Sequence, residues 1–229
     1  MMTGVIIQAT MGSNGVPLTE IGKWPLLGHI FARLDNFSEP PVKKDDPPVK
    51  KVVATSVRTE DDAIEEYCEA NEVEYFRGNA ENAFERFYLC AVEQCFSDVV
   101  ALKADCPFPD IEELSRLLEL HRSTGADYSH SFGSLPAGVG AEVYSFETLR
   151  KIARKASRPK HFSAVNGYIL DKPHLFKISV LEVPEAKRRP ALSLTVETEE
   201  DLQRARFILE SAGGEVTTEE AIEICSKTA

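Results

Sequence analysis

Near the N-terminus, residues 4–17 read GVIIQATMGSNGVP. The apolar run at 5–9 is typical of a buried strand, and a loop of small side chains that includes Gly12 and Ser13 follows it. Many nucleotide-binding α/β domains begin in this way, because the backbone N–H groups of such a loop bind phosphate oxygens and glycine lets the chain approach the ligand. The same pattern also fits a strand followed by an ordinary surface turn.

The stretches that follow alternate between predicted strands and predicted helices. Apolar runs predict strands, and a helical spacing of apolar side chains predicts helices. In the first half, strands are expected at 52–56, 74–76 and 97–103, and helices at 24–34, 61–71, 82–95 and 110–121. Such alternation predicts an α/β fold, with a mainly parallel sheet that helices cover on both faces and with ligands at the carboxyl ends of the strands.

The second half alternates less regularly and contains a glycine- and proline-rich segment at 134–140. Thr198 and Asp201 have the spacing of a capping box, which predicts the start of a helix. The expected strands are at 127–130, 141–144, 175–183 and 191–196, and the expected helices are at 146–156, 198–211 and 217–227.

Composition limits the classes of function. The 229 residues suit one domain over 1–229, with an exposed linker at 35–51 where PPVKK occurs twice. A net charge of −11 argues against binding to nucleic acid or to an anionic membrane. No apolar run is long enough to span a bilayer and no secretory leader pattern is present, so a cytoplasmic protein is expected. The five scattered cysteines lack metal or disulfide spacing and are expected to be reduced.

The opening stretch resembles that of a known enzyme family. It is similar to the first motif of the spore-coat-polysaccharide cytidylyltransferases, relatives of the acylneuraminate and 3-deoxy-manno-octulosonate cytidylyltransferases. The matching residues are Ile6, Ile7, Gln8, Ala9, Met11, Gly12, Ser13 and Pro17. Further blocks match in the same order, at 53–56, 73–78, Arg86, 104–107, 125–128, 142–146 and 194–202.

This resemblance implies a nucleotide-diphospho-sugar transferase-like, Rossmann-like three-layer sandwich. It also implies transfer of CMP from CTP to a sugar or sugar acid with release of pyrophosphate, and a homodimer formed through 134–144. Mg²⁺ would be held by Asp105 and Glu197, the implied catalytic pair. The implied nucleotide contacts are Gln8, Ala9, Met11, Gly12, Ser13, Thr55, Ser56, Arg77 and Gly78, and the implied acceptor contacts are Glu142 and His161.

Three of these residues also have a plainer interpretation. Asp105 fits a turn residue that leads into a helix, and Glu197 fits a surface carboxylate before an N-cap. His161 fits a structural histidine at the start of a helix. Lys23, the nearest cation after the first loop, fits a solvated turn lysine better than a phosphate ligand.

The chain departs from the family pattern in charge. The family has cations where this chain has Thr10, Gly15, Thr19 and Ala101. It also has acidic residues where this chain has Gly140 and Lys160. A charge-assisted hydrogen bond contributes about 1.5–3 kcal/mol, so the loss of several phosphate contacts predicts weak triphosphate binding. Two hypotheses follow: an active cytidylyltransferase, and a catalytically impaired member that serves as a binding, regulatory or scaffolding subunit.

Overall fold

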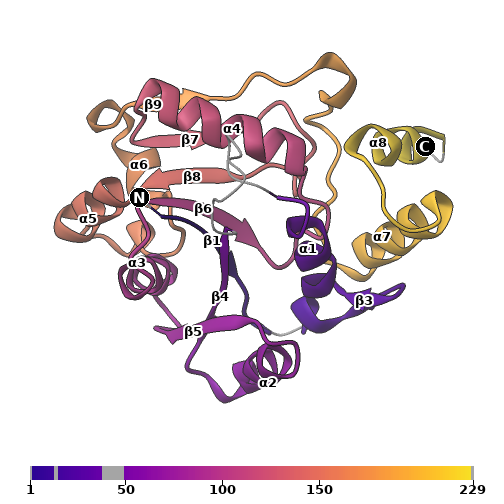
Figure 1. Ribbon diagram of the computed structural model, residues 1–229, viewed down its shortest axis with the longest axis horizontal. Coiled ribbons are helices and arrows are strands. Elements are labelled where there is room, and N and C mark those ends of the chain that lie inside the picture. The colour runs from indigo at the N-terminus through magenta and orange to yellow at the C-terminus, as the bar shows by residue number, and fades with distance from the viewer. Residues whose placement is uncertain (1, 13–14, 38–48, 228–229) are drawn as a thin grey trace.

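The computed structural model describes residues 2–12, 15–37 and 49–227. Within these ranges the centre is a seven-stranded sheet in the order β5-β4-β1-β6-β8-β7-β9 (Figure 1). The strands are β1 (Thr3–Gln8), β4 (Lys50–Ser56), β5 (Glu74–Gly78), β6 (Asp98–Lys103), β7 (Tyr128–His130), β8 (Glu142–Ser145) and β9 (Ile178–Val180). Neighbours pair in parallel except at β8, which runs antiparallel to β6 and to β7. The predicted mainly parallel sheet is confirmed.

Helices cover both faces of this sheet, as predicted. Leu26, Ile64 and Leu117 belong to one core cluster, which joins α1, α2, α4, α7 and α8 to one face. A second cluster joins α3, α5 and α6 to the other face. The helices are α1 (Leu26–Leu34), α2 (Asp62–Ala70), α3 (Ala83–Glu93), α4 (Ile111–Thr124), α5 (Phe146–Lys155), α6 (Gly167–Asp171), α7 (Glu199–Ala212) and α8 (Thr218–Lys227).

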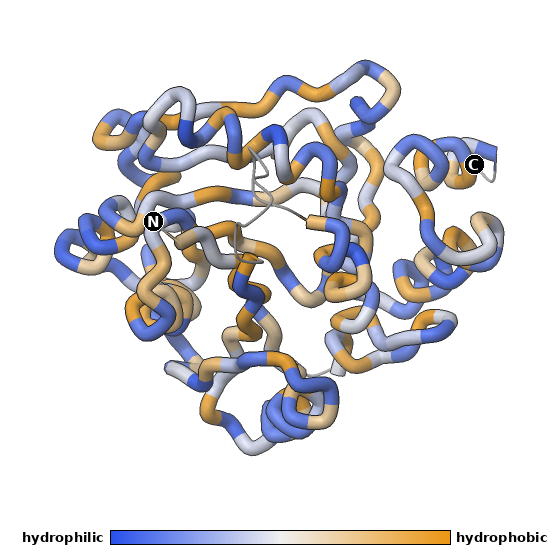
Figure 2. The backbone as a smooth tube through the Cα atoms, in the orientation of Figure 1, coloured by the Kyte–Doolittle hydropathy of each residue, from blue (hydrophilic) through white to orange (hydrophobic). Residues whose placement is uncertain are grey.

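The central strands are buried on both sides, which explains their apolar runs. On β1, Val5 and Ile7 enter the first cluster and Ile6 enters the second, all at 0% exposure. Side chains alternate between the two faces of a strand, so a strand covered on both faces needs apolar residues at every position. Figure 2 shows this hydrophobic stretch along the middle of the sheet.

Several helix boundaries follow the sequence signals. Asp110 caps α4 by accepting a hydrogen bond from Glu113 N, as predicted, and the helix continues to Thr124. The capping box of Thr198 and Asp201 begins α7. At the first helix the prediction was too long, because β3 (Trp24–Pro25) pairs with β2 (Glu20–Ile21) before α1 begins.

Two predicted strands differ from the structure. The strand expected at 175–183 is reduced to β9. The strand expected at 191–196 is wrong: it is an extended segment with only an isolated bridge between Ala137 and Ser193. The backbone of this segment bonds to loops instead of to a strand, with Leu194 N donating to Ala137 O.

The predicted linker at 35–51 is shorter than expected. Lys50 and Lys51 already belong to β4, and Phe37 and Val49 are buried. Residues 38–48 lie outside the described residues.

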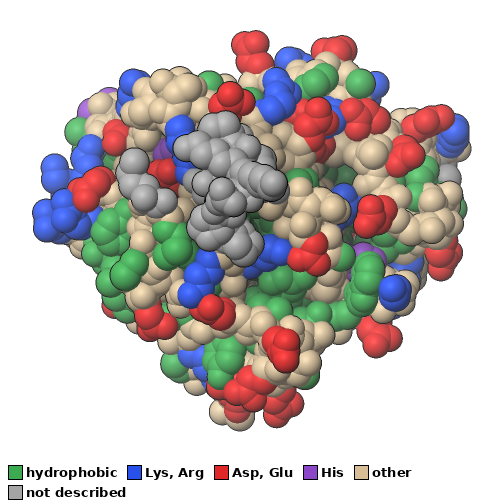
Figure 3. Space-filling model, in the orientation of Figure 1, with side chains coloured by type: hydrophobic (Ala, Val, Ile, Leu, Met, Phe, Trp, Pro, Cys, Tyr) green, Lys and Arg blue, Asp and Glu red, His purple; other side chains and the backbone are tan. Residues whose placement is uncertain are grey.

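The surface view agrees with the acidic composition. Figure 3 shows acidic side chains over much of one face and a group of basic side chains at its left edge, where α5 lies in Figure 1. Each helix in the described part of the chain is too short or too polar to cross a membrane.

Candidate functional site

The carboxyl ends of β1 and β6 lie side by side at one edge of the sheet. Gln8 pairs with Lys103 in the parallel ladder, and Ala104 N donates to Gln8 O over 2.9 Å. From these ends the chain continues into the loop at 9–12 and into Asp105. The first loop and the predicted metal ligand are therefore neighbours, as expected for an α/β sheet.

A pocket of about 420 Å³ lies at this edge, within the volume range of small-molecule sites. It brings together six predicted site residues: Gln8, Ala9, Met11, Gly12, Asp105 and Glu197. Thr10, Val16, Pro17, Arg86, Lys103, Ala104 and Val196 complete its lining. Ser13, also a predicted contact, lies outside the described residues.

Asp105 and Glu197 both line this pocket although they lie far apart in the sequence. Val196 N donates to Asp105 O over 2.8 Å, which holds the extended segment beside the end of β6. Glu197 N donates to Asp201 Oδ2 over 3.1 Å, which ties the same segment to the first turn of α7. Two carboxylates facing one pocket suit a hard divalent cation that takes its other oxygens from water and phosphate. These two residues could therefore hold a divalent cation.

The thiol next to Asp105 is a poor competitor for a soft metal. Cys106 Sγ donates to Asp105 Oδ1 over 3.0 Å. Burial raises the pKa of this thiol, and the Asp105 carboxylate raises it further, so the thiol stays protonated. As predicted, none of the five cysteines forms a disulfide in the described chain.

A buried carboxylate that the sequence analysis missed holds the first loop. Asp61 is 1% exposed, accepts from Met11 N over 2.6 Å and accepts from the Ser56 hydroxyl. The predicted contacts Met11 and Ser56 thus both bond to Asp61. The Met11 N–H and the Ser56 hydroxyl are therefore not free to donate to a nucleotide. In the sequence, Asp61 directly before α2 indicated the start of a helix and gave no sign of a role in the first loop.

Two cations lie on the pocket wall, although the family's cations at Thr10, Gly15, Thr19 and Ala101 are absent. Lys103 is exposed at the end of β6, and Arg86 is 6% exposed on α3. Arg86 Nη1 donates to Asn79 O, whereas Arg86 Nε has no hydrogen-bond partner among the described residues. Burial lowers the pKa of Arg86, but a guanidinium stays charged in proteins. Lys23 lies over the Trp24 ring, outside this pocket.

Four predicted nucleotide contacts do not line the pocket: Ser56, which bonds to Asp61, and Thr55, Arg77 and Gly78. Thr55 is fully buried at the end of β4, and its hydroxyl has no partner in the described chain. Arg77 pairs with Asp62 and Glu65 and donates to Ser56 O, so its charge is already neutralised. Gly78 follows Arg77 at the end of the edge strand β5.

Glu142, a predicted acceptor contact, is buried in a polar cluster beneath the same edge. Its carboxylate accepts from the Tyr128 hydroxyl and from Asn166 Nδ2, and the side chain is not part of the pocket lining. Burial raises the pKa of Glu142, while its hydrogen bonds and the positive charge of Lys103 act in the opposite direction. The arrangement fits a carboxyl group that orients its neighbours.

His161, the other predicted acceptor contact, is 3% exposed and hydrogen-bonded at both ring nitrogens. Its Nδ1 accepts from the backbone N–H groups of Ser157 and Arg158, so Nε2 carries the proton and donates to Asp171 Oδ2 over 3.1 Å. In this geometry the imidazole stabilises the turn at 157–161.

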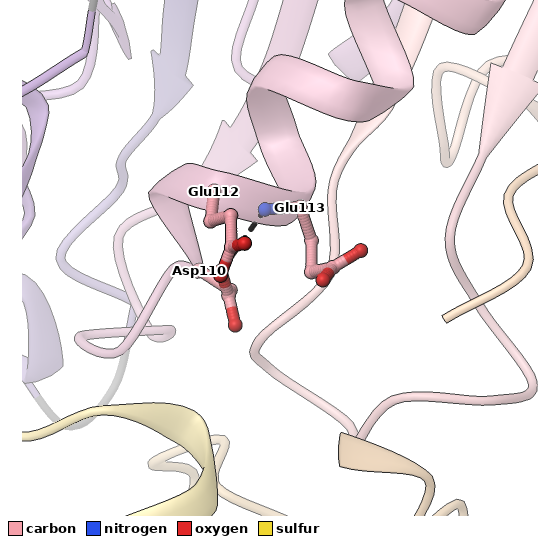
Figure 4. Close-up of side chains that lie close together, drawn as sticks. All are labelled: Asp110, Glu112 and Glu113. Carbon is pink, nitrogen blue, oxygen red and sulfur yellow. Dashed lines mark hydrogen bonds between the residues drawn. The ribbon is translucent and has the colours of Figure 1, made fainter. Parts of the chain in front are cut away.

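A second acidic cluster lies away from the pocket. Asp110, Glu112 and Glu113 converge at the start of α4 (Figure 4). Lys187 Nζ lies 3.0 Å from Asp110, 2.8 Å from Glu112 and 3.1 Å from Glu113. Because an ammonium group already occupies the centre of these carboxylates, the cluster is a buried ion-pair network.

Comparison with known proteins points to one family. The model of the cytidylyltransferase family matches residues 4–218. The spore coat polysaccharide biosynthesis protein SpsF of Bacillus subtilis (strain 168) is 31% identical over 212 residues, which are 91% of this chain and 86% of that protein.

Solved structures share the fold. A cytidylyltransferase from Leptospira borgpetersenii serovar Hardjo-bovis superposes with a TM-score of 0.85 at 23% identity, over 100% of this chain and 95% of that one. CMP:2-keto-3-deoxy-manno-octonic acid synthetase, solved with CTP, superposes with a TM-score of 0.68 at 15% identity, over 93% of this chain and 100% of that one. At these identities the likeness concerns the fold.

Proposed function

The chain belongs to the cytidylyltransferase family, and from this membership we propose that it transfers CMP from CTP to a sugar or sugar acid for polysaccharide biosynthesis. The observation that carries the proposal is the pocket at the ends of β1 and β6. It combines the first loop, two carboxylates and two cations. Nucleotidyl transfer needs these parts, because the leaving pyrophosphate must be neutralised and a divalent ion must be held near the phosphates.

In the proposed reaction an acceptor hydroxyl oxygen bonds to the α-phosphorus of CTP. The bond from that phosphorus to the bridging oxygen breaks, pyrophosphate leaves, and the hydroxyl proton passes to solvent. Gln8 and the loop at 9–12 would orient the nucleotide, and Lys103 and Arg86 would neutralise phosphate oxygens. Asp105 and Glu197 would hold Mg²⁺, which when bound supplies further positive charge to the phosphates.

A pyrophosphate-release assay tests the proposal. With CTP, Mg²⁺ and a panel of sugar acids that includes 3-deoxy-manno-octulosonate and N-acetylneuraminate, the protein is expected to release pyrophosphate. Asp105→Asn and Glu197→Gln should each lower the rate about 100-fold or more, because each removes a carboxylate that would hold the ion. Glu119→Gln, an exposed position on α4, is the matched control and should keep the rate. Equal rates for all four proteins would overturn the assignment of the carboxylates.

The alternative of a catalytically impaired subunit has no support from the comparisons. That alternative was based on the absence of the family's phosphate-binding cations. Lys103 and Arg86 place positive charge in the pocket at the ends of β1 and β6. It predicts millimolar-weak binding of CTP, which calorimetric titration with and without Mg²⁺ would detect.

We also propose that the protein acts in the cytoplasm, where CTP is available, and as a homodimer. Most side chains of 134–144 are buried within the chain itself. A dimer contact at this segment would therefore use Ala137 together with the exposed Phe132 and Gly133. Light scattering coupled to gel filtration should give twice the monomer mass, and Phe132→Asp should reduce it to the monomer mass. A monomer at all concentrations would end this proposal.

A further inference from the structure

One positively charged side chain on the pocket wall forms no hydrogen bond or ion pair within the described residues. Lys103 ends β6, and no hydrogen bond or ion pair joins its Nζ to another described residue. Two other cations among or beside the predicted site residues are neutralised: Arg77 pairs with Asp62 and Glu65, and Lys160 pairs with Asp171. An exposed ammonium that lines a pocket and forms no ion pair with a described residue is available to an anionic ligand.

The face of the sheet fixes the direction of Lys103. Side chains two residues apart on a strand point to the same side. Ala101 packs in the cluster beneath α3, so Lys103 also leaves the sheet on the α3 side, next to its ladder partner Gln8. Ala101 stands where the resembling family has an arginine. Lys103 therefore carries a positive charge on the same face of β6 as that arginine position, two residues closer to the carboxyl end of the strand.

Arg86 supplies a second observation at the same wall. It lies on α3, which packs on that face, and its side chain is almost wholly buried. Its Nε–H has no acceptor among the described residues, although the residue lines the pocket. A buried donor without an acceptor is costly, and an oxygen anion in the pocket would satisfy it.

From this arrangement, and resting on the proposed function, we propose that Lys103 is a phosphate-binding residue for the nucleoside triphosphate, assisted by Arg86. It takes over part of the role of the cations absent at Thr10, Gly15 and Thr19. A phosphate fits better than a sugar-acid carboxylate, because the first loop and the two metal-holding carboxylates line the same pocket as Lys103. The predicted acceptor contacts Glu142 and His161 do not line it.

Calorimetric titration with CTP and Mg²⁺ tests this assignment on the full chain. Lys103→Met keeps the length of the side chain and removes the charge, and it should weaken CTP binding about 10- to 100-fold. Lys103→Arg keeps the charge and should stay within about threefold of the wild-type Kd. Lys155→Met, an exposed lysine on α5, is the matched control and should leave the Kd unchanged. Because Lys103 is exposed, all variants should melt at the wild-type temperature.

The outcomes separate this inference from the proposed function. If the wild type binds CTP and Lys103→Met binds it equally well, the inference is wrong and the proposed function stands. An unchanged Kd for CTP together with a raised KM for the sugar acid would assign Lys103 to the acceptor and overturn the phosphate role. If the wild type binds no CTP, the proposed function itself fails.

Discussion

Lys187 is a cation that is almost wholly buried, at 3% exposure. It lies on the short 3-10 turn η5 (Glu185–Lys187) and joins this turn to the carboxylates at the start of α4. Burial alone lowers the pKa of Lys187, but its hydrogen bonds to Glu112 and Asp110 outweigh burial and raise it, which favours the charged form.

Replacing this cation should be strongly destabilising. Lys187→Met leaves Asp110 buried without a counterion and leaves Glu113 paired only with Arg116, and breaking a buried pair in this way typically costs about 3–5 kcal/mol. Lys227→Met removes a surface pair with Glu223 and should cost less than about 1 kcal/mol. Urea unfolding followed by circular dichroism measures both free energies, and equal losses in the two variants would contradict the buried-network interpretation.

His121 should make stability depend on pH. It is 2% exposed, its Nδ1 lies 2.9 Å from Ser129 Oγ, and burial lowers its pKa to about 4. The unfolded chain, with a histidine pKa of about 6.5, binds the proton more tightly, so stability is full above pH 6.5 and falls as the pH drops toward 4. His121→Gln should remove about 2 kcal/mol of the loss between about pH 7.5 and about pH 5.

Urea unfolding of both proteins at the two pH values measures this difference. Other carboxyl groups titrate in the same range, but they are common to both proteins and cancel. An identical loss of stability in wild type and His121→Gln would show that another group is responsible.

At the level of residues, the sequence predicted part of the site. Gln8, Met11, Gly12, Asp105 and Glu197 were expected together, and they line one pocket. Arg86 matched the resembling family but was not assigned to the site, and Lys103 stands at a position where the resemblance implied no cation. Pairing also cannot be read from a sequence: nothing in it distinguishes an arginine that is tied to carboxylates from a lysine that is free.

At the level of elements, the segment before α7 shows why one strand prediction failed. Leu192, Leu194 and Val196 alternate with the polar residues Ser193 and Thr195, which is the pattern of a half-buried strand. The backbone is extended, yet its hydrogen bonds go to Ala137 and Asp105, which lie in loops. Alternation indicates which side chains are buried. A strand also requires a neighbouring strand as hydrogen-bond partner, and the alternation does not show whether such a neighbour exists.

Gly138 packs directly against this segment, and the consequence can be tested. It has φ +85°, and a Cβ there would lie 2.7 Å from Thr195 N. Gly138→Ala should cost more than the about 1–3 kcal/mol of backbone strain alone and should lower pyrophosphate release about tenfold or more, because displacing Thr195 moves Glu197.

Gly133→Ala is the matched control for that prediction. Gly133 has nearly the same φ, +86°, but a Cβ there would meet nothing within 4 Å. Gly133→Ala should have the same backbone strain but no steric clash, so it should keep its activity. Equal activity losses in the two variants would mean that the contact with Thr195 does not position Glu197.

At the level of the whole molecule, binding should appear as thermal stabilisation. A ligand at 100 times its Kd adds about 2.7 kcal/mol of stability. For a chain of this size each kcal/mol raises Tm by about 2–4 °C, so CTP with Mg²⁺ should raise it by about 5–10 °C. Differential scanning fluorimetry measures the shift, and EDTA should remove most of it. A shift that EDTA leaves intact would contradict a metal-bridged complex.

The overall architecture was the most predictable feature. Regular alternation of apolar strands and amphipathic helices in the first half indicated a covered, mainly parallel sheet, and β1, β4, β5 and β6 follow it. The reversed direction of β8 was not predicted, because strand direction depends on the path of the connecting chain, and the second half alternates too irregularly to reveal it.

The reversed strand also bears on biosynthesis. β6 pairs with β1 on one side and with β8 on the other. In the sequence β8 comes about 40 residues after β6 and also after β7, although β7 lies on the far side of β8 in the sheet. At ribosomal rates of about 5–20 residues per second, the free edge of β6 waits about 2–8 s for its partner during translation. An unpaired apolar edge invites association between nascent chains, so crowded polysomes would be the setting in which this protein most needs chaperones.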